Sequence, residues 1–200
     1  MNAAPHAAEP AWPVPPEGGW TADDLDGLPN LPAHTQLIDA SPVFPCPHSV
    51  FHERAMSFFA RHFDSAAPPE LEAFCRFTVD IDRQNRPEPD VAVVRSDALG
   101  SHERTRVPAT AVVLVVEVVG PDSVSRDRET EPLKYARAKI PHYWRVENEG
   151  GRAAVHVFEL EPTTGSYTSV GIFRGRMKVD APFSVDLDLT GIRTRHGKGE

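Results

Sequence analysis

Alternating apolar and polar positions predict most of the strands in this chain. Residues 75–81 alternate between apolar and polar side chains, which is the period-two pattern of a half-buried strand. Residues 91–94 are apolar throughout, and residues 111–119 form the most apolar segment of the chain. The β-branched run inside that segment favours a central strand that is covered on both faces. Further strands are expected at residues 34–44 (an edge strand or hairpin), at 142–147, at 154–160 and 167–173 (a hairpin), and near Met177 and Phe183.

Apolar residues at helical spacing predict two main helices. Ser49 is suited to cap the first, which is expected to run to about His62. Its core face would consist of Val50, Phe51, Ala55, Phe58, Phe59 and Phe63. The second helix is expected over residues 130–138, where Pro132 is tolerated because it lies in the first turn.

The order of these elements indicates the fold class. Thr21 and Asp24 resemble a capping box that opens a short helical turn, and residues 96–108 predict a surface loop. Two strands, a helix and another strand after a leading helix are typical of a mixed α/β architecture. We therefore expect a mixed β-sheet sandwiched by helices, with extra antiparallel strands near the C-terminus.

Length and composition fit one globular domain. The chain has 200 residues, of which 40% are hydrophobic and 25% charged. We expect this domain to span residues 21–190. A tail at residues 1–20, rich in Pro and Ala, is expected to be disordered, and residues 191–200 are expected to form a flexible C-terminal tail.

The sequence predicts neither a membrane span nor a secretory signal. The longest apolar run, residues 111–116, is too short to cross a bilayer, and residues 1–20 contain no Lys or Arg. Cys46 and Cys75 are the only cysteines. They are therefore expected to be reduced thiols in a cytoplasmic protein.

Net charge limits how the protein could bind nucleic acid. The formal charge is -8, whereas proteins that bind DNA without sequence preference are usually basic, because their affinity comes from neutralising phosphates. Binding to DNA would therefore need a local basic patch or bridging metal ions. Arg126, Arg128, Arg137 and Lys139 could form such a patch, although a solvated helix face is the simpler interpretation.

Glu117 is the most informative residue because it interrupts the apolar segment 111–119. A carboxylate inside a central strand is costly unless a partner pairs with it or a ligand binds it. One interpretation is a salt bridge to Arg126 or Arg145, and the other is a metal ligand at the end of the strand. Taken alone, Glu117 favours the salt bridge.

A second acid changes this balance in favour of a metal site. Asp90 directly precedes the buried strand at residues 91–94, so two neighbouring strands each carry one acid at comparable depth. Carboxylate oxygens are the ligands that Mg²⁺ prefers. Lys134, on the helix that follows Glu117, could place its ammonium beside the ion and assist the attacking water. Asp90, Glu117 and Lys134 therefore predict metal-assisted phosphodiester hydrolysis, with Mg²⁺ or Mn²⁺ bound by Asp90 and Glu117.

Several segments together resemble the Uma2 family of restriction-endonuclease-like proteins. They are the Pro-Glu-Pro-Asp-Val run at 87–91, the segment 114–123 around Glu117, the Arg-Asp-Arg to Lys-Tyr-Ala region at 126–136, and Ile-Pro-His-Tyr-Trp-Arg-Val at 140–146. The likeness extends upstream to Leu37-Ile38-Asp39 and His52, and covers roughly residues 34–190. The resemblance implies the PD-(D/E)XK nuclease fold, with Asp90 and Glu117 binding divalent metal.

This chain departs from the family pattern at three positions. The usual motif has a lysine two residues after the acid, where this chain has Val119, and the resemblance implies that Lys134 replaces it. Gln36 stands where the family often has glutamate, and Ala40 where it often has glycine. If that glutamate takes part in catalysis, this copy is slow or inactive.

For the remaining candidate residues, a structural role is weighed against a functional one. His52 is either a neighbour of the active site or a histidine on the helix surface. Asp127 either hydrogen-bonds Lys134 or caps the helix start, and the cap is favoured. Cys46, His48 and His52 lack the second half of a structural zinc spacing, so zinc is disfavoured. Tyr143 and Trp144 are expected in the core rather than as platforms for nucleobases.

Three functions remain open at this point. The first is a Mg²⁺- or Mn²⁺-dependent endonuclease acting on DNA, with a homodimer compatible with it. The second is a catalytically impaired nuclease-fold module that binds a partner. The third is a hydrolase of a small phosphorylated substrate, for which the sequence has no glycine-rich loop to cradle a phosphate.

Overall fold

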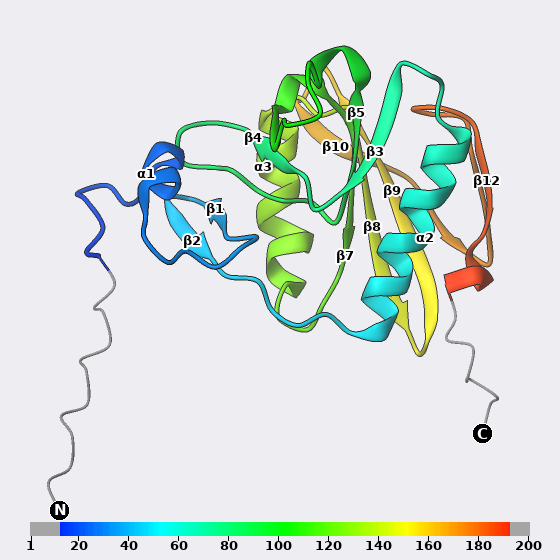
Figure 1. Ribbon diagram of the computed structural model, residues 1–200. Coiled ribbons are helices and arrows are strands. Elements are labelled where there is room, and N and C mark those ends of the chain that lie inside the picture. The colour runs from blue at the N-terminus through cyan, green and yellow to red at the C-terminus, as the bar shows by residue number, and fades with distance from the viewer. Residues whose placement is uncertain (1–12, 193–200) are drawn as a thin grey trace, which may run out of the picture.

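A six-stranded mixed sheet forms the centre of the protein, and the computed structural model describes residues 13–192. The strand order is β10-β9-β8-β7-β5-β3. Only β7 and β8 are parallel, and every other neighbouring pair in this sheet is antiparallel (Figure 1). The strands are β3 (Leu71–Cys75), β5 (Val91–Arg95), β7 (Val112–Val118), β8 (His142–Glu149), β9 (Arg152–Glu161) and β10 (Ser166–Arg174).

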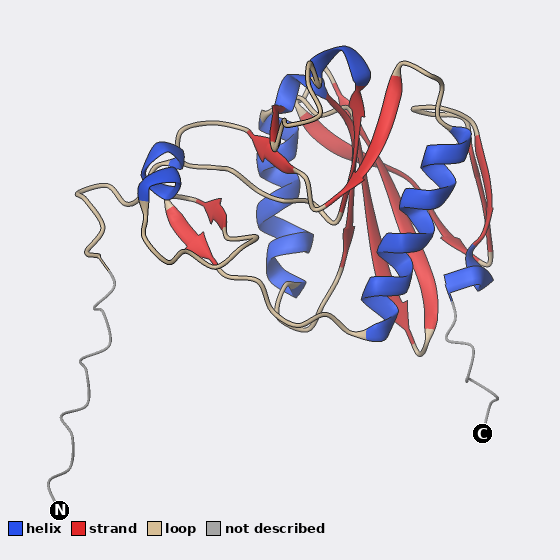
Figure 2. Cartoon of the chain, viewed as in Figure 1, coloured by secondary structure: helices blue, strands red, loops and turns tan. Residues whose placement is uncertain are grey.

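Helices cover both faces of this sheet, as Figure 2 shows. Helix α2 (Val50–Ala66) packs on one face with the aromatic side chains of Phe59, Phe63 and Trp144. Helix α3 (Glu131–Arg137) packs on the other face, where Tyr135 and Tyr143 are buried. The predicted mixed α/β sandwich is confirmed, and so is the placement of Tyr143 and Trp144 in the core.

Helix α2 begins where the sequence predicts and ends four residues later than expected. The Ser49 side chain caps it by accepting a hydrogen bond from the His52 N–H at 3.2 Å. Phe63 continues the apolar face into another turn and is fully buried, so the helix stays favourable up to Ala66. Pro68 then ends it.

The second helix begins earlier than predicted. The chain is helical from residue 124, and a π-helical turn at Arg126–Thr130 runs directly into α3. Pro132 therefore lies inside a longer helix rather than at its first turn. A proline has no N–H to donate, and the wider turn before Pro132 accommodates the missing bond.

The predicted strand at residues 75–81 is wrong as a single element. Arg76 adopts a positive φ of 50°, which ends β3 and turns the chain. Strand β4 (Thr78–Asp80) then pairs in parallel with β6 (Arg106–Pro108), inside the segment predicted as a loop. The same segment holds the short helical turn η1 (Ser96–Ala98), and η2 (Ala109–Ala111) follows it.

A smaller N-terminal unit lies beside the sheet, at the left of Figure 1. Helix α1 (Ala22–Gly27) carries the predicted capping box, in which Thr21 and Asp24 bond each other's backbone. The predicted hairpin is β1 (Gln36–Ile38) with β2 (Ser41–Val43). Trp20, at the end of the segment predicted as a tail, packs against the buried residues of this unit. The rest of the two predicted tails, residues 1–12 and 193–200, lies outside the described residues.

Extra antiparallel strands complete the fold near the C-terminus, as predicted. Strand β11 (Arg176–Val179) pairs with β12 (Val185–Asp188), and the short turn η4 (Leu189–Ile192) follows. Their apolar side chains extend the core on the α2 side. Among residues 13–192, no helix has the length and apolar character needed to cross a membrane.

The buried face of α2 makes a direct prediction about stability. Phe59 is 0% exposed and lies edge-on to Trp144, with ring centroids 6.2 Å apart. We expect Phe59→Ala to lower the free energy of unfolding by about 3–5 kcal/mol, because it removes an aromatic ring and leaves a cavity. The expected core position of Val50 is wrong: this first residue of α2 is 61% exposed, and it is the matched control. Val50→Ala should stay within about 0.5 kcal/mol of the wild type in equilibrium urea unfolding, and equal losses in both variants would contradict the packing described here.

Candidate active site

A cleft of about 270 Å³ opens at the end of β7, where the central strand meets the N-terminal ends of α2 and of the π-helical turn. Side chains from the β1–β2 hairpin, from α2 and from the turn after β7 line it. Most of its polar lining consists of acids and histidines. They include His48, His52, Asp90, Glu117, Asp127 and Glu131.

Asp90 and Glu117 lie side by side in this cleft. The register Val91↔Val116 between antiparallel β5 and β7 sets the two acids opposite each other. The backbone N–H of Asp90 donates to Glu117 Oε2 at 3.2 Å, and the Val118 N–H donates to Asp90 Oδ2 at 2.8 Å. Both residues are buried, with 8% and 6% of their surface exposed. The acids that the sequence singled out are therefore neighbours.

His52 also belongs to the cleft rather than to the helix surface. It lies in the first turn of α2, is 6% exposed, and places Nε2 2.8 Å from Asp90 Oδ1. Its ring lies against that of His48, with centroids 3.8 Å apart and the ring planes tilted by 32°. Burial lowers the pKa of His48, which favours the neutral ring.

Glu117 has no cationic partner among the described residues. Its Oε1 accepts a hydrogen bond from Tyr135 Oη at 2.6 Å. The predicted salt bridges are absent from residues 13–192, since Arg126 pairs with Glu131 at 3.1 Å and Arg145 pairs with Glu147 at 2.9 Å. Glu117 is therefore held by neutral donors and by neighbouring acids.

Glu131 was missed by the sequence analysis although it is central to the cleft. It is 3% exposed and lies against Glu117. Asp127, Glu131 and Tyr135 are spaced four residues apart, so they share one face of a helix. That spacing would have predicted the cluster if the helix had been expected to begin at residue 124 rather than 130.

The acids of the cleft outnumber its cations, and their pKa values follow from this. Burial raises the pKa of Glu117 well above its ordinary value, and the neighbouring Glu131, Asp90 and Asp127 charges raise it further. Burial likewise raises the pKa of Glu131 to about 7 and that of Asp127 to about 6. Near neutral pH, these carboxyls either keep a proton or need a cation in its place.

Asp127 occupies neither of its two predicted positions. Its carboxylate accepts a hydrogen bond from the Ser123 hydroxyl, and its carbonyl accepts one from Tyr143 Oη at 2.5 Å. It lies within the helix because the helix starts at residue 124, so it does not cap residue 130. It makes no hydrogen bond to Lys134, whose ammonium is engaged elsewhere.

Lys134 is not brought together with Asp90 and Glu117. Its Nζ donates to Asp39 in the tight turn between β1 and β2. Lys134 is also absent from the residues that line the cleft, whereas Arg126 and Arg76 are among them. The contact with Asp39 joins α3 to the hairpin that carries Gln36, which does line the cleft.

The other departures noted in the sequence have local explanations. The side-chain carbonyl of Gln36 accepts a hydrogen bond from the backbone N–H of Glu88 at 3.1 Å. Ala40 has a positive φ of 59° in the tight β1–β2 turn, a conformation that glycine adopts more readily. Cys46 lines the cleft, and both cysteines are free thiols.

Comparison with known proteins identifies the family of this chain. The model of the Uma2 family, described as "Putative restriction endonuclease", matches residues 23–190. The chain belongs to the Uma2 family. A comparison with curated proteins finds no match.

A solved structure supports the same fold. A protein from Anabaena variabilis, described as a "putative nuclease belonging to DUF820", is 16% identical and has a TM-score of 0.65, with 86% of this chain and 96% of that chain covered. This likeness confirms the restriction-endonuclease-like fold expected of a Uma2 protein. Two NucC structures, from P. aeruginosa and E. coli, are each 13% identical with a TM-score of 0.35. They cover 58% and 60% of this chain, and 70% and 78% of their own lengths.

The raised pKa of Glu131 predicts how stability depends on pH without metal. The folded protein holds this proton up to about pH 7, whereas an unfolded glutamate releases it near pH 4.5. The stability contributed by protonated Glu131 is therefore full below about pH 4.5 and lost as the pH rises through 7. Glutamine cannot ionise, so Glu131→Gln should gain on the order of 2 kcal/mol relative to the wild type between pH 5 and pH 8.

Urea unfolding in EDTA at several pH values measures this difference. Glu129→Gln, an exposed change two residues away in the chain, is the control and should follow the wild type at every pH. Parallel curves for wild type and Glu131→Gln would show that Glu131 ionises normally.

Proposed function

We propose that this Uma2 protein is a metal-dependent endonuclease that hydrolyses phosphodiester bonds of DNA, with Asp90 and Glu117 holding Mg²⁺ or Mn²⁺. The observation that carries the proposal is the pairing of these two buried acids without a cationic partner for Glu117. Membership of a family described as restriction endonucleases supports the same reaction class.

The donor set of the cleft fits a divalent cation. Asp90 and Glu117 offer carboxylate oxygens, which hard cations such as Mg²⁺ require. Glu131 and Asp127 add carboxyl groups nearby, and the pKa of each is raised, chiefly because the group is buried and also because of neighbouring acids. A divalent ion would relieve this repulsion, and the acids would then bind it with the loss of protons.

Each residue of the cleft has a distinct part in the proposed reaction. A bound divalent ion polarises a phosphate oxygen and lowers the pKa of attacking water. Tyr135 orients Glu117 through its hydroxyl, and the Val118 N–H orients Asp90. Arg126 and Arg76 are the cleft cations that could contact substrate phosphates. Lys134 acts as a positioning residue, because it holds the β1–β2 turn through Asp39.

One alternative is favoured by a specific observation. Gln36 lines the cleft where the family often has glutamate, and Lys134 lies outside the cleft lining. A catalytically impaired module that binds a partner through the same surface would show both features. Such a protein would bind metal or nucleic acid without cleaving it.

Isosteric variants of the two acids test the proposed reaction. Incubated with supercoiled plasmid and Mn²⁺ or Mg²⁺, the wild type should nick or linearise the DNA. Asp90→Asn and Glu117→Gln should each lower the rate by at least about 100-fold, because losing a ligand costs more than the 10- to 100-fold typical of an outer partner. EDTA should abolish the reaction.

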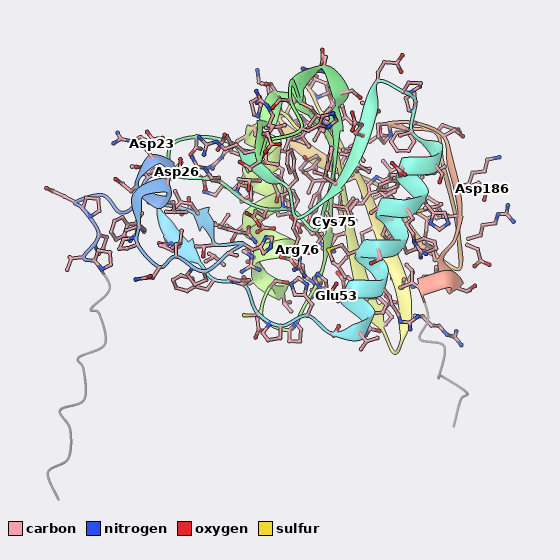
Figure 3. The ribbon with its side chains drawn as sticks, in the orientation of Figure 1. Asp23, Asp26, Glu53, Cys75, Arg76 and Asp186 are labelled. Atoms are coloured by element: carbon pink, nitrogen blue, oxygen red, sulfur yellow. The ribbon has the colours of Figure 1, made fainter. Side chains whose placement is uncertain are left out.

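The control for this assay is Asp186→Asn. Asp186 of β12 forms an exposed ion pair with Arg176 of β11, and Figure 3 shows Asp186 far from Arg76, which lines the cleft. This variant should cleave at the wild-type rate, and circular dichroism should show that all variants are folded. Equal background cleavage by the wild type and Asp90→Asn would reject the catalytic claim and favour the binding module.

A second experiment separates a positioning role of Lys134 from a direct one. The Lys134–Asp39 pair has one exposed partner, so it contributes about 1 kcal/mol or less. Lys134→Met and Asp39→Asn should therefore each slow plasmid cleavage by less than about fivefold, and the double variant should be no slower than either. If Lys134→Met abolished cleavage while Asp39→Asn kept the wild-type rate, Lys134 would act on the reacting atoms.

A further inference from the structure

We propose that His48, His52 and Asp90 form a transition-metal site, so that the cleft prefers an ion such as Zn²⁺ to Mg²⁺. The inference deepens the proposed function and rests on it for Asp90 as a metal ligand. It adds two imidazole ligands that neither the family description nor the pair of acids supplies. Its test is metal binding, which is measured separately from cleavage.

The three side chains already have the spacing of ligands around one ion. One donor atom of each lies within 4.8 Å of the other two. His52 Nε2 and Asp90 Oδ1 are 2.8 Å apart. Two ligands at right angles around an ion at about 2.1 Å are about 3 Å apart. An ion could therefore replace the proton that now joins these two atoms, with only a small movement of either side chain.

The local backbone holds the two histidines in register. His48 precedes the helix cap Ser49, and His52 follows one helical turn later. The Ser49 side chain bonds the His52 N–H and so fixes the geometry of this first turn. Histidines four residues apart present their rings on the same side of a helix, as in zinc-binding helices. Although His48 lies just before the helix, its ring and that of His52 are adjacent here, with centroids 3.8 Å apart.

Outer partners orient the His48 ring. Its Nδ1 contacts Arg76 Nη2 and lies 3.3 Å from Glu53 Oε1, and Arg76 Nη2 also donates to that oxygen at 2.8 Å. Figure 3 shows Glu53 and Arg76 together beside the first turns of α2. Both contacts involve Nδ1, so Nε2 is the ring nitrogen that neither Arg76 nor Glu53 occupies. Carboxylate–histidine pairs of this kind are the usual support of metal-binding histidines.

The chemistry of the ligands determines which ion is preferred. Imidazole nitrogen suits Zn²⁺ and ions such as Ni²⁺ and Cu²⁺, whereas Mg²⁺ and Mn²⁺ are held by oxygen ligands and water. Two imidazoles with one carboxylate therefore favour a transition-metal ion. Cys46 lines the cleft but belongs to no ligand group found among residues 13–192.

Metal titration of the full chain tests this site. Calorimetry should show one Zn²⁺ bound per chain, and Co²⁺ should bind with the visible absorption of a site containing nitrogen ligands. His48→Gln should weaken Zn²⁺ binding by at least about tenfold, since it removes a ligand. The same variant should change Mg²⁺ affinity by less than about twofold. His48 lies in the segment before the helix cap, so this variant is expected to fold, and circular dichroism verifies that.

The control is His102→Gln, an exposed histidine in the loop after η1. It should bind Zn²⁺ as the wild type does. Unchanged Zn²⁺ affinity in His48→Gln, or Mg²⁺ binding as tightly as Zn²⁺ to the wild type, would overturn the proposal.

Failure of this site is distinguishable from failure of the proposed function. Tight Zn²⁺ binding that needs His48, without plasmid cleavage in any metal, would support the site and reject the nuclease. Cleavage with Mg²⁺ that needs Asp90, together with Zn²⁺ affinity independent of His48, would support the nuclease and reject the imidazole ligands.

Discussion

The carboxylate of Glu117 lies near the end of the most buried strand. The other groups of the cleft compensate for the free energy that burying this carboxylate costs. A buried carboxylate without a cation is unstable unless donors, protons or a metal compensate for the lost water. Here Tyr135 and the Asp90 N–H supply two donors, and no arginine or lysine among residues 13–192 reaches Glu117. The nearby Asp90 and Glu131 raise its pKa rather than lower it. The packing of β7 therefore keeps acidic groups close together, and a divalent cation would reduce the repulsion between them.

The fold places these acids at an accessible edge of the sheet rather than deep inside it. Strand β7 ends at Val118, and the chain then turns into the helical segment that brings Asp127 and Glu131 back over Glu117. Helix α2 approaches from the opposite face and contributes His52 from its first turn. The two helical layers of the sandwich therefore meet the sheet at one cleft. The proposed function depends on that convergence of both helices with the sheet and not on any single side chain.

Local patterns predicted the parts of this arrangement that local physics determines. The apolar run of β7 and the position of Asp90 before β5 follow from two adjacent buried strands, so the pairing of Asp90 with Glu117 could be foreseen. The sequence pattern does not predict the position of Glu131, because Pro132 favours a helix that begins near residue 130. In the structure a π-helical turn precedes Pro132, and the helix begins earlier. Lys134 was misplaced because its partner, Asp39, lies 95 residues away in a turn whose position no periodicity encodes. The contact of His52 with Asp90 depends on the same kind of long-range packing.

The proposed function depends on a divalent ion bound between Asp90 and Glu117. Anomalous diffraction from crystals of the full chain grown with Mn²⁺ tests it most directly. We expect one strong anomalous peak in the cleft, about 2 Å from a carboxylate oxygen of both Asp90 and Glu117. A cleft without a peak at saturating Mn²⁺, with His52 still bonded to Asp90 and Tyr135 still bonded to Glu117, would contradict it.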